Sequence, residues 1–128
     1  MKQFCPLLFQ PVSAGFPSPA DDFIEMQLNI HDYLVKHPAA SFFLRVAGDS
    51  MNGAGIFTGD ILVVDRSLQA SNLDLVIALV EGYFTVKQLQ RNKQGQYRLL
   101  AANPSYPPIE CEELEIWGVV TGVVRKYK

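Results

Sequence analysis

The chain has 128 residues, of which 48% are hydrophobic, and its formal net charge is -2 at pH 7. This length is enough for one compact core and too short for two ordinary domains, so we expect a single domain. The slightly acidic balance gives no general attraction for a polyanion, because non-specific nucleic-acid binding depends on clustered Lys and Arg that neutralise phosphates. We therefore expect no direct DNA binding.

The two cysteines, Cys5 and Cys111, make neither a disulfide framework nor a closely spaced pair of metal ligands. No stretch approaches the roughly 18 uninterrupted apolar residues that a membrane helix requires. The first residues also lack a basic segment followed by an apolar run, as a secretory signal would have. We expect free thiols, no metal ion or other cofactor, no membrane anchor and a cytoplasmic location.

The N-terminal segment is rich in proline, with Pro6, Pro11, Pro17 and Pro19. Each proline removes a backbone donor and disfavours both helix and central strand, so we predict an extended arm from Met1 to about Ala20. From Asp21 to His37 the apolar residues follow neither a helical nor a strand period. Only a short helix over residues 31–36 is predicted there, ended by Pro38.

The rest of the chain consists of runs rich in β-branched, aromatic and aliphatic residues, which are typical of strands. These runs span Ser41–Ala47, Asp60–Asp65, Leu73–Val80, Tyr83–Gln90, Tyr97–Ala101 and Leu114–Tyr127. The fold class is therefore mostly β, with at most one short helix. Glu81-Gly82 has the spacing of a tight hairpin turn, and Asn92–Gln96 indicates a looser one.

Several of these runs lack the apolar–polar alternation of a half-exposed strand. Examples are Ile61-Leu62-Val63-Val64 and Val76-Ile77-Ala78-Leu79-Val80. Continuous apolar runs favour strands that are covered on both faces.

Ser50 is the first candidate for chemistry, since it follows a predicted strand and precedes the glycine-rich turn 52–55. A serine in such a turn can be exposed, with its own and neighbouring backbone N–H groups free to form an oxyanion hole. Most Gly-Asp-Ser triplets are ordinary turns, so this motif alone is a weak signal.

A nucleophilic serine also needs a base. His31 and His37 lie in segments that suggest no triad, which makes lysine the alternative. A lysine base must be neutral, so its pKa has to fall from about 10.4 through burial among apolar groups. Lys87 is the candidate because it lies within a predicted strand, on the face that carries Thr85 and Leu89. The pattern alone favours a solvated edge-strand lysine instead.

Five motifs in a fixed order change this balance. They are Gly48-Asp49-Ser50-Met51, then residues 59–65 (GDILVVD), 84–89 (FTVKQL) and 103–109 (NPSYPPI), and finally Gly118-Val119-Val120. This ordered set resembles the LexA/UmuD family of self-cleaving serine peptidases, and the resemblance runs from about Ala14 to Lys126. It implies the family's catalytic β fold of curved antiparallel sheets, with an extended N-terminal arm.

The resemblance also assigns roles to residues. It makes Ser50 the nucleophile, Lys87 the general base, and the backbone amides of Asp49 and Ser50 the oxyanion donors. The segment 13–20 resembles the family's self-cleavage segment, which places the scissile bond between Ala14 and Gly15. Residues 1–14 are then an arm removed by cleavage, and residues 15–128 are the peptidase and dimerisation domain.

The partners implied by the resemblance are a second copy of the chain, a RecA filament on single-stranded DNA that accelerates cleavage, and the catalytic subunit of a Y-family polymerase. The implied role is in translesion synthesis during the SOS response. The arm is short for a helix-turn-helix domain, which makes the UmuD branch more similar than the LexA branch.

Other functions stay open at this point. A non-catalytic β interaction module could regulate polymerase assembly with an arm that is never cut. A signal-peptidase-like enzyme shares the serine–lysine logic, although the missing membrane helix argues against it. A repressor remnant fits poorly with the acidic balance.

Overall fold

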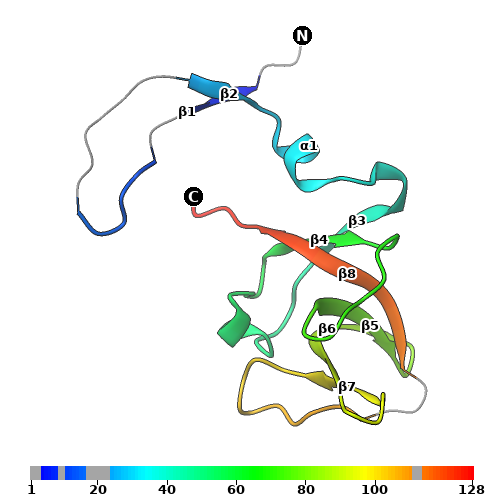
Figure 1. Cartoon of the computed structure of the whole chain (residues 1–128). Helices are drawn as coiled ribbons and strands as arrows, with labels where there is room; N and C mark the ends of the chain where they lie inside the picture. The colour runs from blue at the N-terminus through cyan, green and yellow to red at the C-terminus, as the bar shows by residue number, and fades with distance from the viewer. Residues whose placement is uncertain (1–3, 9–10, 17–23, 111–113) are drawn as a thin grey trace. The chain divides into compact units, whose positions relative to one another are not determined.

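The computed structural model describes residues 4–8, 11–16, 24–110 and 114–128 (Figure 1). Their contacts divide the chain into two compact units, Met1–Lys36 and His37–Lys128. The predictions for Cys111, Pro17 and Pro19 lie outside the described residues. The predicted domain boundary depends on cleavage after Ala14, so it stays a prediction.

The first unit contains a two-stranded antiparallel sheet of β1 (Cys5–Leu8) and β2 (Ile24–Leu28). The sequence analysis assigned no strand to either segment, which was wrong. Pro6 did not prevent pairing, because each strand of a two-stranded sheet has one open edge where a missing N–H costs nothing. Almost all residues of both strands are exposed, so no burial pattern marked them in the sequence.

The short helix of the first unit, α1 (Ile30–Leu34), lies slightly earlier than the predicted range 31–36. The Asn29 side chain caps it by accepting a hydrogen bond from Asp32 N–H at 3.2 Å. Val35 already has extended backbone angles and ends the helix. The presence of a short helix was therefore predicted correctly. Its first residue was not, because the capping residue Asn29 sets it and the periodicity of apolar residues does not.

The second unit is a six-stranded antiparallel sheet with strand order β3-β4-β8-β5-β6-β7. Its elements are η1 (Pro38–Ala40), β3 (Ser41–Arg45), η2 (Asn52–Ala54), β4 (Ile61–Asp65), β5 (Leu75–Val80), β6 (Tyr83–Arg91), β7 (Tyr97–Leu100) and β8 (Glu115–Val124). Each of the six predicted strands is present with its ends shifted by at most a few residues. The mostly β fold class is confirmed.

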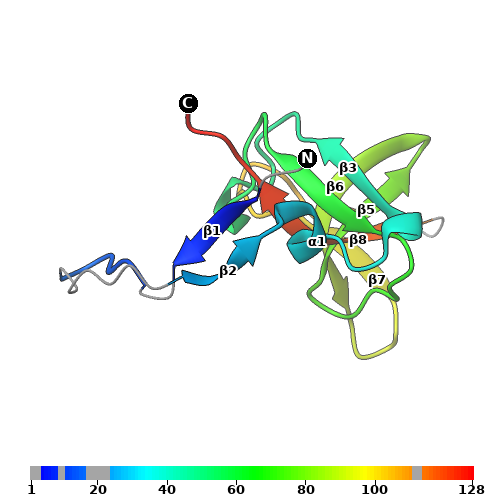
Figure 2. The ribbon, with the colours of Figure 1, turned by 90° about the horizontal axis from the view of Figure 1, so that it is seen from above.

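The sheet curves because β8 contains two irregularities. Its register against β5 shifts between Ile77 and Ala78, and its register against β4 shifts between Val63 and Val64. Such bulges bend a strand and increase its twist. The strands accordingly fan out when the sheet is seen from above (Figure 2).

Both predicted turns are present. Glu81 and Gly82 connect β5 to β6 with φ values of 50° and 83°, the positive angles that a two-residue hairpin turn requires. Asn92 N–H donates to Gln96 O at 2.9 Å and closes the looser turn between β6 and β7.

Two apolar clusters cover opposite faces of β5. Ile77 belongs to the first cluster, whereas Val76 and Ala78 belong to the second, as the two-residue period of a strand dictates. The continuous run Leu62-Val63-Val64 of β4 is also fully buried. The expectation that these unalternating runs are covered on both faces is thus confirmed.

Candidate active site

Ser50 lies in the loop that leaves β3, where the backbone makes a sharp change of direction. Gly48 has φ of 105°, a left-handed conformation that favours glycine, and its N–H donates to Thr58 Oγ1 at 2.9 Å. The next residue after the serine, Met51, is 2% exposed and belongs to the first apolar cluster. Ser50 itself is half-buried, and it lies between the turn at Gly48 and the buried side chain of Met51.

Lys87 lies in the middle of β6 and is only 6% exposed. Its Nζ is 2.9 Å from Ser50 Oγ, 2.8 Å from Thr85 Oγ1 and 3.1 Å from the carbonyl oxygen of Val86. Leu89, which shares its face of β6, belongs to the second apolar cluster. The strand therefore holds an amine against a serine hydroxyl in apolar surroundings.

Burial lowers the pKa of Lys87 below its usual value, because desolvation disfavours the ammonium form. No carboxylate of the described residues forms an ion pair with Lys87 that would oppose this effect. A neutral lysine keeps two N–H donors, and Thr85 Oγ1 and Val86 O are the acceptors for both. The amine lone pair is then left for the proton of Ser50.

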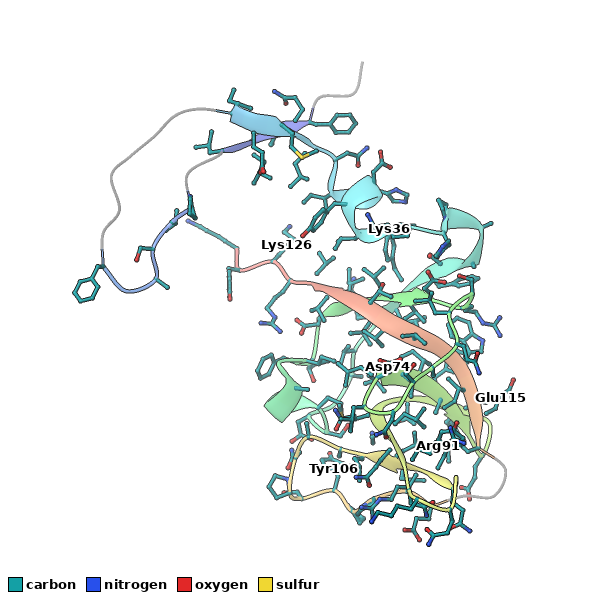
Figure 3. The ribbon with its side chains drawn as sticks, viewed as in Figure 1. Lys36, Asp74, Arg91, Tyr106, Glu115 and Lys126 are labelled. Atoms are coloured by element: carbon teal, nitrogen blue, oxygen red, sulfur yellow. The ribbon has the colours of Figure 1, made fainter. Side chains whose placement is uncertain are left out.

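The peptide before Ser50 is held by the loop after β7. Asn103 Nδ2 donates to Asp49 O at 2.9 Å, and the Tyr106 hydroxyl donates to the Asp49 carboxylate. This carboxylate raises the pKa of Tyr106 above its usual value. Figure 3 labels Tyr106 on this loop, next to the loop that contains η2. Within the described part of the chain, the backbone N–H groups of Asp49 and Ser50 donate to no protein atom.

The structure thus brings together Ser50, Lys87 and the two amides that the sequence analysis singled out. Their catalytic roles are not tested by this proximity and stay predictions. His37 is paired elsewhere, with Nδ1 2.6 Å from Asp65 Oδ2.

Sequence reasoning missed three residues at this site. Thr85 was noted only as sharing a face with Lys87, a two-residue spacing that could have marked it as a partner of the amine. Asn103 and Tyr106 were quoted within a motif but given no role, because a contact between positions more than fifty residues apart leaves no local signal.

The predicted scissile residues lie in the first unit. Ala14 and Gly15 are exposed and form part of a bend over residues 14–16. The Gly15 N–H donates to Ser13 Oγ at 3.3 Å, a local contact that an extended conformation would break. Both residues of the predicted scissile bond are therefore accessible to solvent.

Comparison with known proteins identifies the family. A sequence model of the Peptidase S24-like family matches residues 6–121. The chain belongs to the Peptidase S24-like family. Its match to this family spans the Ser50 loop, all of β6 and the loop that carries Asn103.

Individual S24-like relatives cover nearly the whole chain. The protein SamA of Salmonella typhimurium is 46% identical over 121 residues, which are 94% of this chain and 85% of SamA. The protein MucA of Escherichia coli is 46% identical, over 91% of this chain and 81% of MucA. The LexA repressor of Shewanella denitrificans is 40% identical over 94% of this chain and 59% of the repressor. The predicted resemblance is thus confirmed at the level of the family.

Neither a group of metal ligands nor a membrane-spanning helix is found among the described residues of this S24-like chain. No three His, Cys, Asp or Glu side chains among them converge as ligands of a metal ion would. None of the helices in the described ranges is long and apolar enough to cross a membrane.

Proposed function

We propose that this chain is a self-cleaving peptidase in which Ser50 is the nucleophile and Lys87 the general base. The observation that carries the proposal is the 2.9 Å contact between Lys87 Nζ and Ser50 Oγ, with the lysine only 6% exposed. A buried amine with a lowered pKa, and with no ion-pair partner among the residues that the structure describes, is suited to accept a proton near neutral pH.

The reaction forms and breaks bonds in two stages. The Ser50 proton moves to neutral Lys87 as Oγ attacks the carbonyl carbon of Ala14, and the N–H groups of Asp49 and Ser50 stabilise the oxyanion. The Ala14–Gly15 C–N bond then breaks, and the new Gly15 amine takes the proton from Lys87. Water, deprotonated by Lys87, hydrolyses the ester between Ser50 and Ala14 and regenerates the serine.

The bond between Ala14 and Gly15 is the proposed substrate. Both residues are exposed, and neither carries a side chain that would keep the backbone away from Ser50. Cleavage separates Met1–Ala14 from Gly15–Lys128, which we propose as the peptidase and dimerisation domain.

The biological role that we propose follows from the family. The cleaved chain, as a cytoplasmic homodimer, would be the accessory subunit of a Y-family polymerase in SOS mutagenesis and translesion synthesis. A RecA filament on single-stranded DNA would accelerate cleavage by favouring the conformation in which the arm reaches the serine. S24-like relatives such as MucA and SamA support this role.

An interaction module without catalysis is the second candidate. Phe42, Phe84 and Trp117 form a half-exposed aromatic cluster, with ring centroids 5.3 Å and 4.9 Å from that of Trp117. Exposed aromatic groups of this kind are common at protein interfaces. Such a module would need neither Ser50 nor Lys87.

Mass spectrometry of the purified chain separates the two candidates. We expect the native chain, incubated at about pH 10 where lysine is substantially neutral, to release Met1–Ala14. Ser50→Ala and Lys87→Ala should both remain intact under the same conditions. A native chain that stays whole, even with RecA filaments added, would favour the interaction module.

A further inference from the structure

We propose that Asn103 is a positioning residue that sets the direction of the Ser50 N–H group, so that this amide can act as an oxyanion donor. The inference rests on the proposed self-cleavage and adds a residue to which the sequence analysis gave no role. Asn103 does not touch the reacting atoms; it acts through the peptide bond between Asp49 and Ser50.

The peptide bond between Asp49 and Ser50 couples the direction of its carbonyl to that of its N–H group. It is planar and trans, so the Asp49 carbonyl and the Ser50 N–H point in opposite directions. Any group that fixes the carbonyl oxygen also fixes the amide hydrogen. Asn103 Nδ2 donates to this oxygen at 2.9 Å, so the Ser50 N–H is directed away from the loop after β7.

Two described residues, Asn103 and Asn52, donate to the Asp49 carbonyl oxygen. The N–H of Asn52 also donates to Asp49 O, but at 3.3 Å, which is long for an N–H···O hydrogen bond. The local turn therefore leaves the carbonyl loosely oriented. The contact from Asn103 is the shorter one, and it ties the turn to the loop after β7.

Asn103 is itself held in place by hydrogen bonds to its neighbours. Its Oδ1 accepts from Ser105 N–H at 3.0 Å, and its carbonyl accepts from Tyr106 N–H at 3.1 Å. One residue earlier, Ala102 O accepts from Gly53 N–H at 2.8 Å. Asn103 is therefore held on both sides before it reaches Asp49, as a group that positions another must be.

The role of Tyr106 is different. Its hydroxyl donates to the Asp49 side chain and leaves the direction of the peptide to Asn103. Replacement of Tyr106 loosens the same loop without removal of the carbonyl contact. Tyr106→Phe is therefore a matched comparison for Asn103→Ala.

The expected effect is a slower reaction with an unchanged base. Deletion of an oxyanion donor typically costs about 100- to 1000-fold in rate, so misdirection of one should cost about 10- to 100-fold. The midpoint of the pH–rate profile should stay that of the native chain, because Asn103 makes no hydrogen bond to Lys87 within the described residues. A variant that merely opened the site to water would instead raise the pKa of Lys87 and move the midpoint upward.

The test measures self-cleavage of the full-length chain from about pH 7 to about pH 10, for the native protein, Asn103→Ala, Tyr106→Phe and Asn92→Ala. Asn92 is the matched control, because it makes comparable turn hydrogen bonds between β6 and β7. Thermal unfolding of each variant reports on folding. Asn103→Asp keeps the size of the side chain and an acceptor for Ser105 but loses the donor, so its maximal rate tests the inference if the alanine variant does not fold.

The inference requires a lower maximal rate and an unshifted midpoint for Asn103→Ala, a smaller loss for Tyr106→Phe, and native behaviour for Asn92→Ala. Cleavage of Asn103→Ala and Asn103→Asp at the native rate would overturn it while the proposed function stood. A shifted midpoint for Asn103→Ala would also overturn it, in favour of a structural role. A native chain that is neither cut nor labelled at Ser50 by a fluorophosphonate would overturn the proposed function and this inference together.

Discussion

Lys87 meets two opposing demands. Its ammonium form could donate to all three of its neighbours, Ser50, Thr85 and Val86, whereas catalysis needs the neutral form. Burial favours the neutral form by raising the free energy of the ammonium. The burial that lowers this pKa therefore destabilises the folded chain whenever the lysine is protonated.

This conflict predicts that Lys87→Met abolishes self-cleavage and raises the free energy of unfolding at neutral pH. The pKa of Lys87 is lower in the folded than in the unfolded chain, so the unfolded chain binds more protons in the window between the two values. Stability of the native chain therefore rises with pH in this window. The advantage of Lys87→Met should shrink as the pH rises from about 7 to about 10.

Urea unfolding at several pH values measures this advantage. Lys36→Met serves as the matched control, because Lys36 is exposed and its replacement should give no such trend. An advantage of Lys87→Met that stays constant across the range would mean that burial does not perturb the lysine.

The contact between Lys87 and Ser50 was predictable from the sequence only through the ordered motifs. Strand alternation indicated that Lys87 shares a face with Thr85, but the pattern itself favoured a solvated lysine. Lys87 pairs with Val76 of β5 in the sheet register and shares its face of β6 with Leu89, and both of these residues belong to the second apolar cluster. No local property of β6 reveals that Lys87 will be buried.

At the scale of elements, the loop after Ser50 is tied to the end of β8 by a bidentate ion pair. Arg125 Nε and Nη2 each lie 2.6 Å from an oxygen of Asp60, and Nη2 also donates to Gly55 O. Phe57 N–H donates to the same carboxylate, and the Arg125 guanidinium stacks over the Phe57 ring at 4.7 Å. Asp60 is 2% exposed, and both oxygens of its carboxylate accept hydrogen bonds.

This arrangement predicts a specific pH dependence for Asp60→Asn. The hydrogen bond from Arg125 lowers the pKa of Asp60 to about 2, below its unfolded value of about 3.9. Its stabilising contribution is therefore complete above the unfolded value and lost as the pH falls toward 2. Asp60→Asn should be less stable than the native chain at pH 7, and the difference should close between about pH 4 and about pH 2.

Chemical unfolding of the two chains over this pH range measures the difference. Asp74→Asn is a suitable control, because Asp74 accepts a backbone hydrogen bond from Ser71 but forms no ion pair among the described residues. A stability gap between the native chain and Asp60→Asn that persists unchanged at the acid end would contradict the assignment.

The strands that could be predicted are those whose apolar composition indicates that they are buried. Continuous apolar runs marked β4 and β5, and the Glu81-Gly82 turn fixed the hairpin of β5 and β6. β1 and β2 escaped prediction because their residues are almost all exposed, so no alternation was imposed on them. The curvature was expected only from the family resemblance, since the register shifts of β8 arise from its pairing with two different partners and leave no local signal.

At the scale of the whole molecule, the two apolar clusters belong to the second unit. Every buried residue of the two clusters lies between Val46 and Leu99, and the partly buried groups that pack on them lie between Leu44 and Val120. No described residue of the segment 1–14 belongs to either cluster. The loop that positions Asp49 and the strand that carries Lys87 are likewise in the second unit.

Removal of the arm should therefore leave the fold of the second unit intact. We expect a chain of residues 15–128 with Ser50→Ala to unfold within a few degrees of the full-length Ser50→Ala chain, because the apolar area buried in the core is the same. Near-ultraviolet circular dichroism of Trp117, which packs on Phe42 and Phe84, follows this transition. A large drop in the unfolding temperature would mean that the arm stabilises the sheet, and that cleavage would destabilise the product.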